Sequence, residues 1–268
     1  MWRFRLRTLL IAVAGICLVL GPIASLQHGA RTQRRNVARL EAAGAFIHYD
    51  YQLVNFRGRI GCDGEAQPPD DLFVRCLGVQ GTCRVAGVWC PKWRDENGAV
   101  TSEFADADMR LLEPFTSLRW ILVSSGKITD DGTEVLARFA NLEDLGLGSH
   151  YVTDRTVERL VLHNTKLTAL SLGGTAITDR SVEMLASLPE LKVLNLSDTA
   201  VTGGCIESIC HLRGLVELNL TRTSIGKGRL GALRCLRRLE TVDATDTGVS
   251  EQDVLELTAD RPNLTVYR

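Results

Sequence analysis

The sequence predicts an α/β solenoid, in which a curved parallel sheet lies inside and helices lie outside, preceded by a transmembrane helix. Two observations predict this fold. A leucine recurs every 24 or 25 residues from Leu118 to Leu264, and residues 9–26 form an uncharged apolar run. A repeat of this length indicates supersecondary units that can bury their apolar faces only against neighbouring units.

Each repeat combines the pattern of a strand with the pattern of a helix, as residues 165–188 (TKLTALSLGGTAITDRSVEMLASL) illustrate. The alternation at Leu170 and Leu172 is typical of a short strand, whereas Val182 and Leu185 recur at helical spacing. The preceding Thr178-Asp179 favours a helix N-terminus. Because strands are narrower than helices, the stacked units are expected to curve with the strands on the inner face.

A threonine recurs in the turn that follows each strand, at Thr175, Thr199, Thr223 and Thr247. We expect its hydroxyl to bond to the backbone of the neighbouring turn, which would form a ladder along the stack.

The pattern L-x-x-L-x-L-x-x-T-x-I/V-T-D resembles leucine-rich repeats, specifically the ribonuclease-inhibitor-like or cysteine-containing subtype. The resemblance covers residues 115–268 as six units and a terminal strand. It extends more loosely to residue 84, where CRVAGVWC predicts an earlier strand and residues 104–115 its helix. The N-terminal RFRLRTLL and the following QRRNVARLEAAGAFIHYDYQL are similar to membrane-anchored bacterial proteins with such repeats. The resemblance implies a protein-binding scaffold and names no partner.

The N-terminus predicts a membrane anchor. Residues 1–8 are a basic tail, and residues 9–26 would span about 27 Å as a helix, close to the hydrocarbon thickness of about 30 Å. An uncleaved signal anchor is favoured over a cleaved signal because the nearest cleavage patterns, at residues 22–24 and 28–30, are poor. The short tail favours a single-pass protein with its repeats on the extracytoplasmic side, although arginines at residues 31–35 compete.

The segment between the anchor and the repeats predicts a cap that covers the first repeat. Residues 27–44 form a juxtamembrane helix that ends at Gly44, and residues 45–114 form the cap. Within the cap, residues 45–53 alternate like a strand, and residues 57–71 have the glycine, proline and aspartate content of a loop.

The cap contains a group of cysteines with three alternative interpretations. They form disulfides if the domain is exported, they bind zinc, or they are reduced thiols. Zinc is disfavoured because the spacing lacks a short Cys-x₂₋₄-Cys knuckle. Sequence does not choose among the possible pairings of Cys62, Cys76, Cys83 and Cys90. The helix-side cysteines of the repeats are expected to be free thiols that pack as small apolar residues, namely Cys205, Cys210 and Cys235.

Composition and motifs disfavour catalysis and nucleic-acid binding. The formal net charge is −1, whereas a nucleic-acid-binding protein usually carries a basic excess. No phosphate-binding loop, hydrolase or metalloprotease motif is present, and no cofactor is expected. The row Asp130, Asp131, Asp154 and Asp179 suggests either metal ligands or, as we favour, helix starts. An enzyme that pairs a cap cysteine with His48 is a weaker alternative. An adaptor of the F-box type is disfavoured because this sequence shows no F-box-like helical region.

The positions that face outward from the inner strands predict the binding surface. The residues of this surface are mostly small and polar, and the surface is mildly acidic. It therefore suits a protein or peptide with a basic patch. Trp120 either anchors a partner or packs against the cap. The predicted partner-binding residues are Trp120, Asp144, Asn195, Glu217, Asn219 and Asp243.

These observations predict a membrane-tethered scaffold that binds a partner on its concave face and performs no catalysis. The alternative is a structural or self-assembling module of the cell envelope without a dedicated ligand. For this alternative, the strand at residues 264–268, which has no predicted capping helix, would stack on another copy of the chain.

Overall fold

The structure of the protein is a computed structural model that describes residues 29–49, 53–56, 59–62, 85–90 and 104–268. The predicted anchor at residues 9–26 lies outside these ranges and stays a prediction. Within the described ranges, no helix combines the length and the apolar character needed to cross a bilayer.

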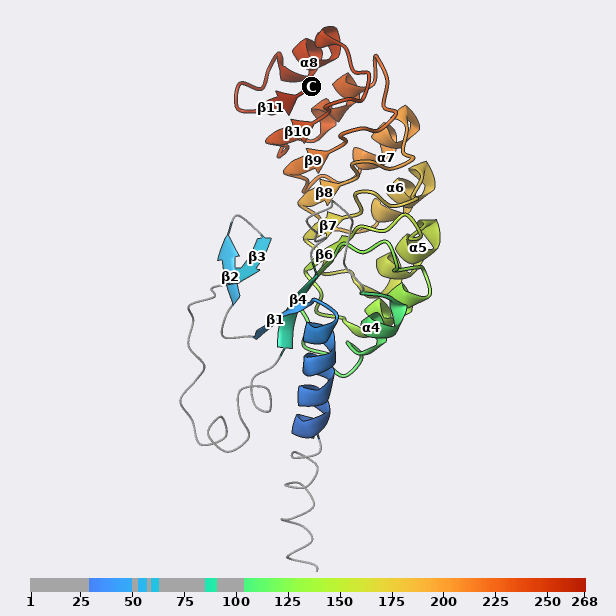
Figure 1. Ribbon diagram of the computed structural model, residues 1–268. Coiled ribbons are helices and arrows are strands. Elements are labelled where there is room, and N and C mark those ends of the chain that lie inside the picture. Colours follow the sequence, from blue (N-terminus) through green and yellow to red (C-terminus); the bar gives the residue numbers. More distant parts are fainter. Residues whose placement is uncertain (1–28, 50–52, 57–58, 63–84, 91–103) are drawn as a thin grey trace, which may run out of the picture.

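The main sheet has nine strands in the order β1-β4-β5-β6-β7-β8-β9-β10-β11. Strand β1 pairs with β4 in antiparallel orientation, and every later pair is parallel. Figure 1 shows the strands stacked along one side of the molecule and the helices along the other. The strands are β1 (Phe46–Tyr49), β4 (Val85–Cys90), β5 (Trp120–Val123), β6 (Asp144–Leu147), β7 (Ala169–Ser171), β8 (Val193–Asn195), β9 (Glu217–Asn219), β10 (Thr241–Asp243) and β11 (Thr265–Tyr267).

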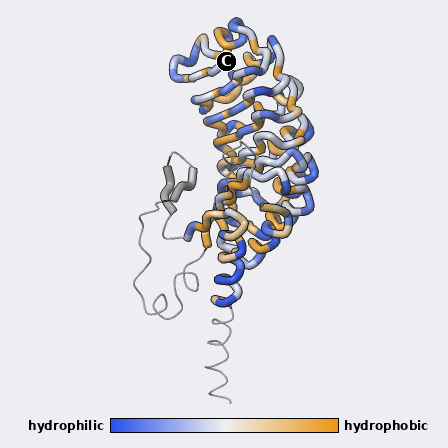
Figure 2. The backbone as a smooth tube through the Cα atoms, viewed as in Figure 1, coloured by the Kyte–Doolittle hydropathy of each residue, from blue (hydrophilic) through white to orange (hydrophobic). Residues whose placement is uncertain are grey.

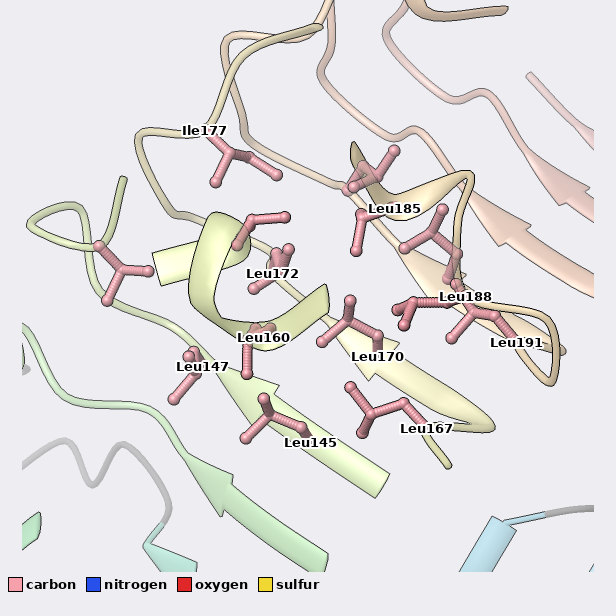
Figure 3. Close-up of a cluster of buried hydrophobic side chains, with 14 of the residues drawn as sticks. Leu145, Leu147, Leu160, Leu167, Leu170, Leu172, Ile177, Leu185, Leu188 and Leu191 are labelled. Atoms are coloured by element: carbon pink, nitrogen blue, oxygen red, sulfur yellow. The ribbon is translucent and has the colours of Figure 1, made fainter. Parts of the chain in front are cut away.

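The register of the sheet confirms the predicted stacking of apolar residues. Leu170 lies opposite Leu194, and Leu194 lies opposite Leu218, on adjacent parallel strands. All three side chains are buried. Figure 3 shows how Leu145 and Leu170 point toward the same apolar layer as Leu160 of the helical side. Each such side chain contributes about 1.5–3 kcal/mol only when it is buried, so each unit depends on its neighbours.

The outer layer contains short α-helices and 3₁₀ helices. Three described segments, η2, η3 and η4, are 3₁₀ helices. Each contains glycine, as at Gly132 and Gly231, which lowers the propensity for an α-helix. Figure 2 shows apolar and polar segments alternating along each turn of the stack. The elements are α4 (Asp106–Arg110), η2 (Gly132–Arg138), α5 (Asp154–His163), α6 (Asp179–Leu185), η3 (Gly203–Cys205), α7 (Ile206–Ile209), η4 (Leu230–Cys235) and α8 (Glu251–Thr258).

The juxtamembrane helix covers residues 29–42 and buries Val37 and Leu40 in the same apolar core as the first units. The predicted helix end is confirmed, because Gly44 follows with φ of +86°. The predicted strand at residues 45–53 is confirmed in its first part by β1, and β4 confirms the strand in CRVAGVWC.

The predicted loop at residues 57–71 is wrong for residues 59–62. These residues form β3 (Arg59–Cys62), which pairs with β2 (Leu53–Phe56) in a separate two-stranded antiparallel sheet. Backbone pairing between β2 and β3 stabilises a hairpin here despite its glycine. Composition alone does not reveal this pairing.

The predicted ladder of turn threonines is also wrong. Each hydroxyl donates to a carbonyl of its own unit, three residues earlier: the Thr175 Oγ1 lies 2.6 Å from the Leu172 oxygen, and the Thr247 Oγ1 lies 2.6 Å from the Ala244 oxygen. The residue before each of these threonines has a positive φ, as at Gly174. This tight turn brings the hydroxyl back toward its own strand instead of the next unit.

The structure corrects the prediction for two of the three cysteines in the repeats. Cys210 and Cys235 are joined in a disulfide and are not free thiols. Their Cα atoms lie 5.9 Å apart, a usual separation for this bond, because α7 and η4 are neighbours in the stack. The prediction holds for Cys205, which is a buried free thiol.

Candidate partner-binding face

Two rows of side chains run across the sheet on the face away from the helices. One row joins Trp120, Asp144, Ala169, Val193, Glu217 and Thr241, and the other joins Leu122, Gly146, Ser171, Asn195, Asn219 and Asp243. All six predicted partner-binding residues belong to these rows. The parallel register therefore places them on a single face.

Four of the predicted residues line one hollow in the C-terminal half of this face. The hollow has a volume of about 290 Å³ and spans strands β8 to β11. Its polar side chains include no lysine or arginine. These four residues are Asn195, Glu217, Asn219 and Asp243.

The side chains at the ends of β8, β9 and β10 are held by a repeated backbone contact. The Asn195 Oδ1 accepts from the Ser197 nitrogen at 2.9 Å, and the Asn219 Oδ1 accepts from the Thr221 nitrogen at 2.8 Å. These contacts fix the orientation of both amides, and the NH₂ groups are their donors toward a partner.

Asp243 makes the corresponding contact with a carboxylate. Its Oδ1 accepts from the Thr245 nitrogen at 3.1 Å and from the Thr245 hydroxyl at 2.7 Å. Burial acts to raise the pKa of Asp243, but the hydrogen bonds from Thr245 outweigh it and hold the pKa below the ordinary value. The carboxylate is therefore charged at neutral pH, and the hollow attracts cations.

The other two predicted residues are buried. Trp120 is 4% exposed and packs against His48 of the cap, with ring centroids 5.0 Å apart, and Asp144 is 8% exposed. Burial lowers the pKa of His48, which keeps the imidazole neutral at neutral pH. Of the two roles considered for Trp120, the structure places it in the packing between cap and repeats.

Three exposed aromatic residues on this face were not among the predicted site residues. Phe46 and Trp89 lie opposite each other on β1 and β4 with ring centroids 5.5 Å apart, and Tyr267 on β11 lies opposite Asp243. The alternation in CRVAGVWC, which places Trp89 two residues after Gly87, is the signal that identifies Trp89 as outward-facing.

The carboxylates of Asp130 and Asp154 in the predicted acidic row link successive units. Asp130 accepts from the Thr153 nitrogen and hydroxyl at 2.9 and 2.6 Å, and Asp154 accepts from those of Thr178 at 2.9 and 2.7 Å. Thr178 is also the helix N-cap that the sequence predicts, and Thr153 caps α5 in the same way. Across the described residues, no group of three potential ligands is arranged to hold a metal ion.

The cysteines of the cap are only partly described. Cys90 is buried at the end of β4, whereas the side chains of Cys62, Cys76 and Cys83 lie outside the described residues. The pairing of these four cysteines therefore stays a prediction. In the repeats, burial and then the charge of Asp179 raise the pKa of Cys205 to about 12, so this thiol is not a nucleophile at neutral pH.

Comparisons with known proteins match one unit of the stack. Residues 163–186 match the family described as leucine-rich repeat. No curated protein matches the chain.

Among solved structures, an internalin from Listeria monocytogenes is similar to the chain. It is 17% identical, with a TM-score of 0.37, over 59% of this chain and 56% of the internalin chain. The match thus spans little more than half of the internalin chain. The comparisons therefore identify the unit at residues 163–186 as similar to a leucine-rich repeat, and the neighbouring units pair with it in register.

Proposed function

We propose that the protein is a membrane-tethered leucine-rich-repeat scaffold that binds a protein or peptide on the concave face of its sheet and performs no catalysis. The observation that carries this proposal is the hollow where Asn195, Glu217, Asn219 and Asp243 meet. Four residues selected from the sequence for binding lie together in one concavity, and a partner with a basic patch complements their charge.

The membrane tether and the compartment are parts of the same proposal. The tether rests on the uncharged run at residues 9–26 and its arginine-rich flanks. The disulfide between Cys210 and Cys235 supports an oxidising compartment. We therefore place the repeats on the extracytoplasmic side. The similarity to the ribonuclease-inhibitor-like subtype and to membrane-anchored bacterial proteins belongs to this proposal as well.

We propose the absence of catalysis because the side chains that could act as nucleophile, base or metal ligand are buried, stacked or hydrogen-bonded. Cys205 is buried with its pKa raised to about 12, and His48 stacks on Trp120. The carboxylates of Asp130 and Asp154 are held by threonines of the next unit. These groups are engaged in packing and in linking units.

Site-specific photo-crosslinking in native membranes tests the proposed face. A photoreactive phenylalanine analogue replaces Asn219 in the hollow or, as the control, Leu162, which is exposed on α5. Discrete adducts are expected only from position 219, and changing both Glu217 and Asp243 to lysine should abolish them. Equal adducts from both positions, or adducts unchanged by the charge reversal, would exclude this face.

The alternative function, a self-assembling module, is favoured by one observation. Strand β11 is an edge of the described sheet and pairs there with β10 alone, so its outer side can template another strand. Light scattering of the full chain in detergent separates the functions. A mass that rises with concentration, and falls when Val266 in β11 is changed to proline, would support self-assembly. A constant monomer would exclude it.

A further inference from the structure

The concave face carries two chemically different hollows. The first is the acidic hollow already described, between β8 and β11. The second has a volume of about 130 Å³, and its lining includes Trp89, Leu122, Gly146 and Ser171. Both hollows lie along the same row of the sheet, because Trp89, Leu122, Gly146 and Ser171 precede Asn195 in one continuous register.

The second hollow is bordered by large exposed apolar side chains. Phe46 is 45% exposed and Trp89 is 43% exposed, and their rings lie against each other. The neighbouring floor contains Gly146 and Gly148, and the side chains of Leu122 and Ser124 fill the space above them. A Cβ at Gly146 would lie 2.7 Å from Leu122, and one at Gly148 would lie 2.8 Å from the Ser124 hydroxyl. A bulky apolar side chain of a partner would cover both aromatic rings here.

The acidic hollow has the features that recognise a guanidinium group. Glu217 and Asp243 supply carboxylates on adjacent strands, and Tyr267, 54% exposed, supplies a ring beside Asp243. A planar guanidinium can bond to a carboxylate and stack on an aromatic ring, whereas an ammonium group is a point charge without a stacking face. Arginine is therefore favoured over lysine.

The spacing between the hollows defines the length of the occupant. Leu122 on β5 and Glu217 on β9 are separated by four strand spacings, which is about 19 Å. An extended chain advances about 3.3 Å per residue, so about six residues cover this distance. An even number also directs both side chains to the same side of the extended segment. Within the acidic hollow, the amide NH₂ groups of Asn195 and Asn219 can donate to its main-chain carbonyls.

We propose that the occupant of the concave face is an extended segment of a partner protein, with a bulky apolar residue over Trp89 and Leu122 and an arginine about six residues away between Glu217 and Asp243. This inference rests on the proposed function, because it specifies the partner of the same face. It adds the aromatic pair of the cap as a second anchor.

Fluorescence anisotropy with designed peptides tests this proposal on the full chain in detergent. The probes are labelled peptides of serine and threonine with one leucine and one arginine, separated by three to nine positions in either order. Binding should be tightest at a separation near six and weaker when lysine replaces arginine. Trp89→Ala should weaken it about five- to thirty-fold, and Phe46→Ala, an independent variant of the same pair, should also weaken it. The control is Tyr151→Ala, an exposed aromatic outside the sheet rows.

The outcomes separate this proposal from the general function. Affinity that is independent of the separation, unaffected by both Trp89→Ala and Phe46→Ala, or absent for every peptide would overturn the two-anchor occupant. In that case, crosslinking at position 219 that depends on Glu217 and Asp243 would still support the concave face. Loss of the crosslinking result would overturn the general function. Circular dichroism of each variant identifies any loss of fold, and Phe46→Ala then carries the test if Trp89→Ala unfolds.

Discussion

At the scale of single residues, the aspartates of the helix starts form the polar connections between units. Asp154 shows the complete arrangement: it accepts from the Thr178 nitrogen, the Thr178 hydroxyl and the Ser181 hydroxyl of the following unit. The aspartate thus accepts hydrogen bonds from the N-cap threonine of the next helix and also lies in the first turn of its own helix. Hydrogen bonds to a charged acceptor are about twice as strong as neutral ones.

Replacing this aspartate should loosen two units at once. Asp154→Ala removes three hydrogen bonds and leaves the Thr178 and Ser181 donors without their acceptor, so we expect a loss of about 2–3 kcal/mol in the free energy of unfolding. The matched control is Asp131→Ala, whose exposed side chain pairs with Arg155 at 3.4 Å, and it should cost less than about 0.5 kcal/mol. Urea denaturation measures both values, and equal losses would contradict this role.

The same carboxylates make stability depend on pH. Burial acts to raise the pKa values of Asp130 and Asp154, but hydrogen bonds from Thr153, Thr156, Thr178 and Ser181 outweigh it, and both pKa values lie below the ordinary value for aspartate. Above pH about 5 the carboxylates are ionised in the folded and unfolded chain, and their contribution is nearly complete. Below it, the unfolded chain binds protons first and stability falls.

We therefore expect the free energy of unfolding to decrease as the pH falls from about 5 through the lowered pKa values. Asp154→Asn should be less stable at pH 6 and should lose less stability between pH 6 and pH 3 than the unchanged chain. Urea denaturation at a series of pH values measures this difference. Parallel pH profiles for the two chains would show that the Asp154 carboxylate does not cause the pH dependence of the free energy of unfolding.

At the scale of elements, the junction between cap and repeats depends on one missing side chain. Trp120 of β5 lies across Gly87 of β4 toward His48 of β1, and a Cβ at Gly87 would lie 1.9 Å from its ring. Neither the indole nor the backbone of β4 can move without disturbing the sheet. The glycine thus allows the tryptophan to bind the cap strand to the first repeat.

Gly87→Ala should separate these elements at a cost of about 1–3 kcal/mol or more, since overpacking forces the backbone and ring apart. Trp120→Leu should partly restore the stability of the Gly87→Ala chain because it removes the clash. Gly126→Ala is the control, because nothing lies within 4 Å of its added Cβ. Thermal unfolding compares the unchanged chain, Gly87→Ala, the double variant of Gly87→Ala with Trp120→Leu, and Gly126→Ala. An unchanged melting temperature for Gly87→Ala would refute this packing.

The disulfide is a second connection between elements, α7 and η4, across 25 residues of sequence. Closing a loop of this length restricts the unfolded chain, and its removal should cost about 3 kcal/mol. Changing both Cys210 and Cys235 to serine should therefore lower the free energy of unfolding by this amount under oxidising conditions. Reductant should then lower the stability of the double variant less than that of the unchanged chain. Equal stability of the oxidised and reduced chains would contradict this contribution.

At the scale of the whole molecule, the repeat period was sufficient to predict the stacked parallel sheet. Leu170, Leu194 and Leu218 can be buried only against neighbouring units, so their spacing determines which residues become neighbours. The hairpin of β2 and β3 and the disulfide of Cys210 were not predictable in this way. Both depend on contacts between segments whose relative position no local pattern records.

The candidate site was predictable to the extent that it follows the strand pattern. Asn195, Glu217, Asn219 and Asp243 face outward because alternation along each strand decides their side. The burial of Trp120 depends on the cap, which pairs with the sheet in antiparallel orientation and lies outside the repeat. The aromatic pair of Phe46 and Trp89 arises from that same pairing, which explains why repeat analysis omitted it.

The stack also predicts how position along it changes the effect of one substitution. Leu191 and Leu264 occupy the same position of the repeat, but Leu191 has a unit on either side, whereas Leu264 belongs to the edge strand unit and is 8% exposed rather than 1%. Leu191→Ala should cost about 3–4 kcal/mol, within the usual range for a buried leucine, and Leu264→Ala about 1–2 kcal/mol. Hydrogen exchange should show increased exchange in units on both sides of Leu191 but only near β10 and β11 for Leu264→Ala. Equal costs, or exchange spread evenly over the sheet in both variants, would contradict a stack in which each unit is stabilised mainly by its immediate neighbours.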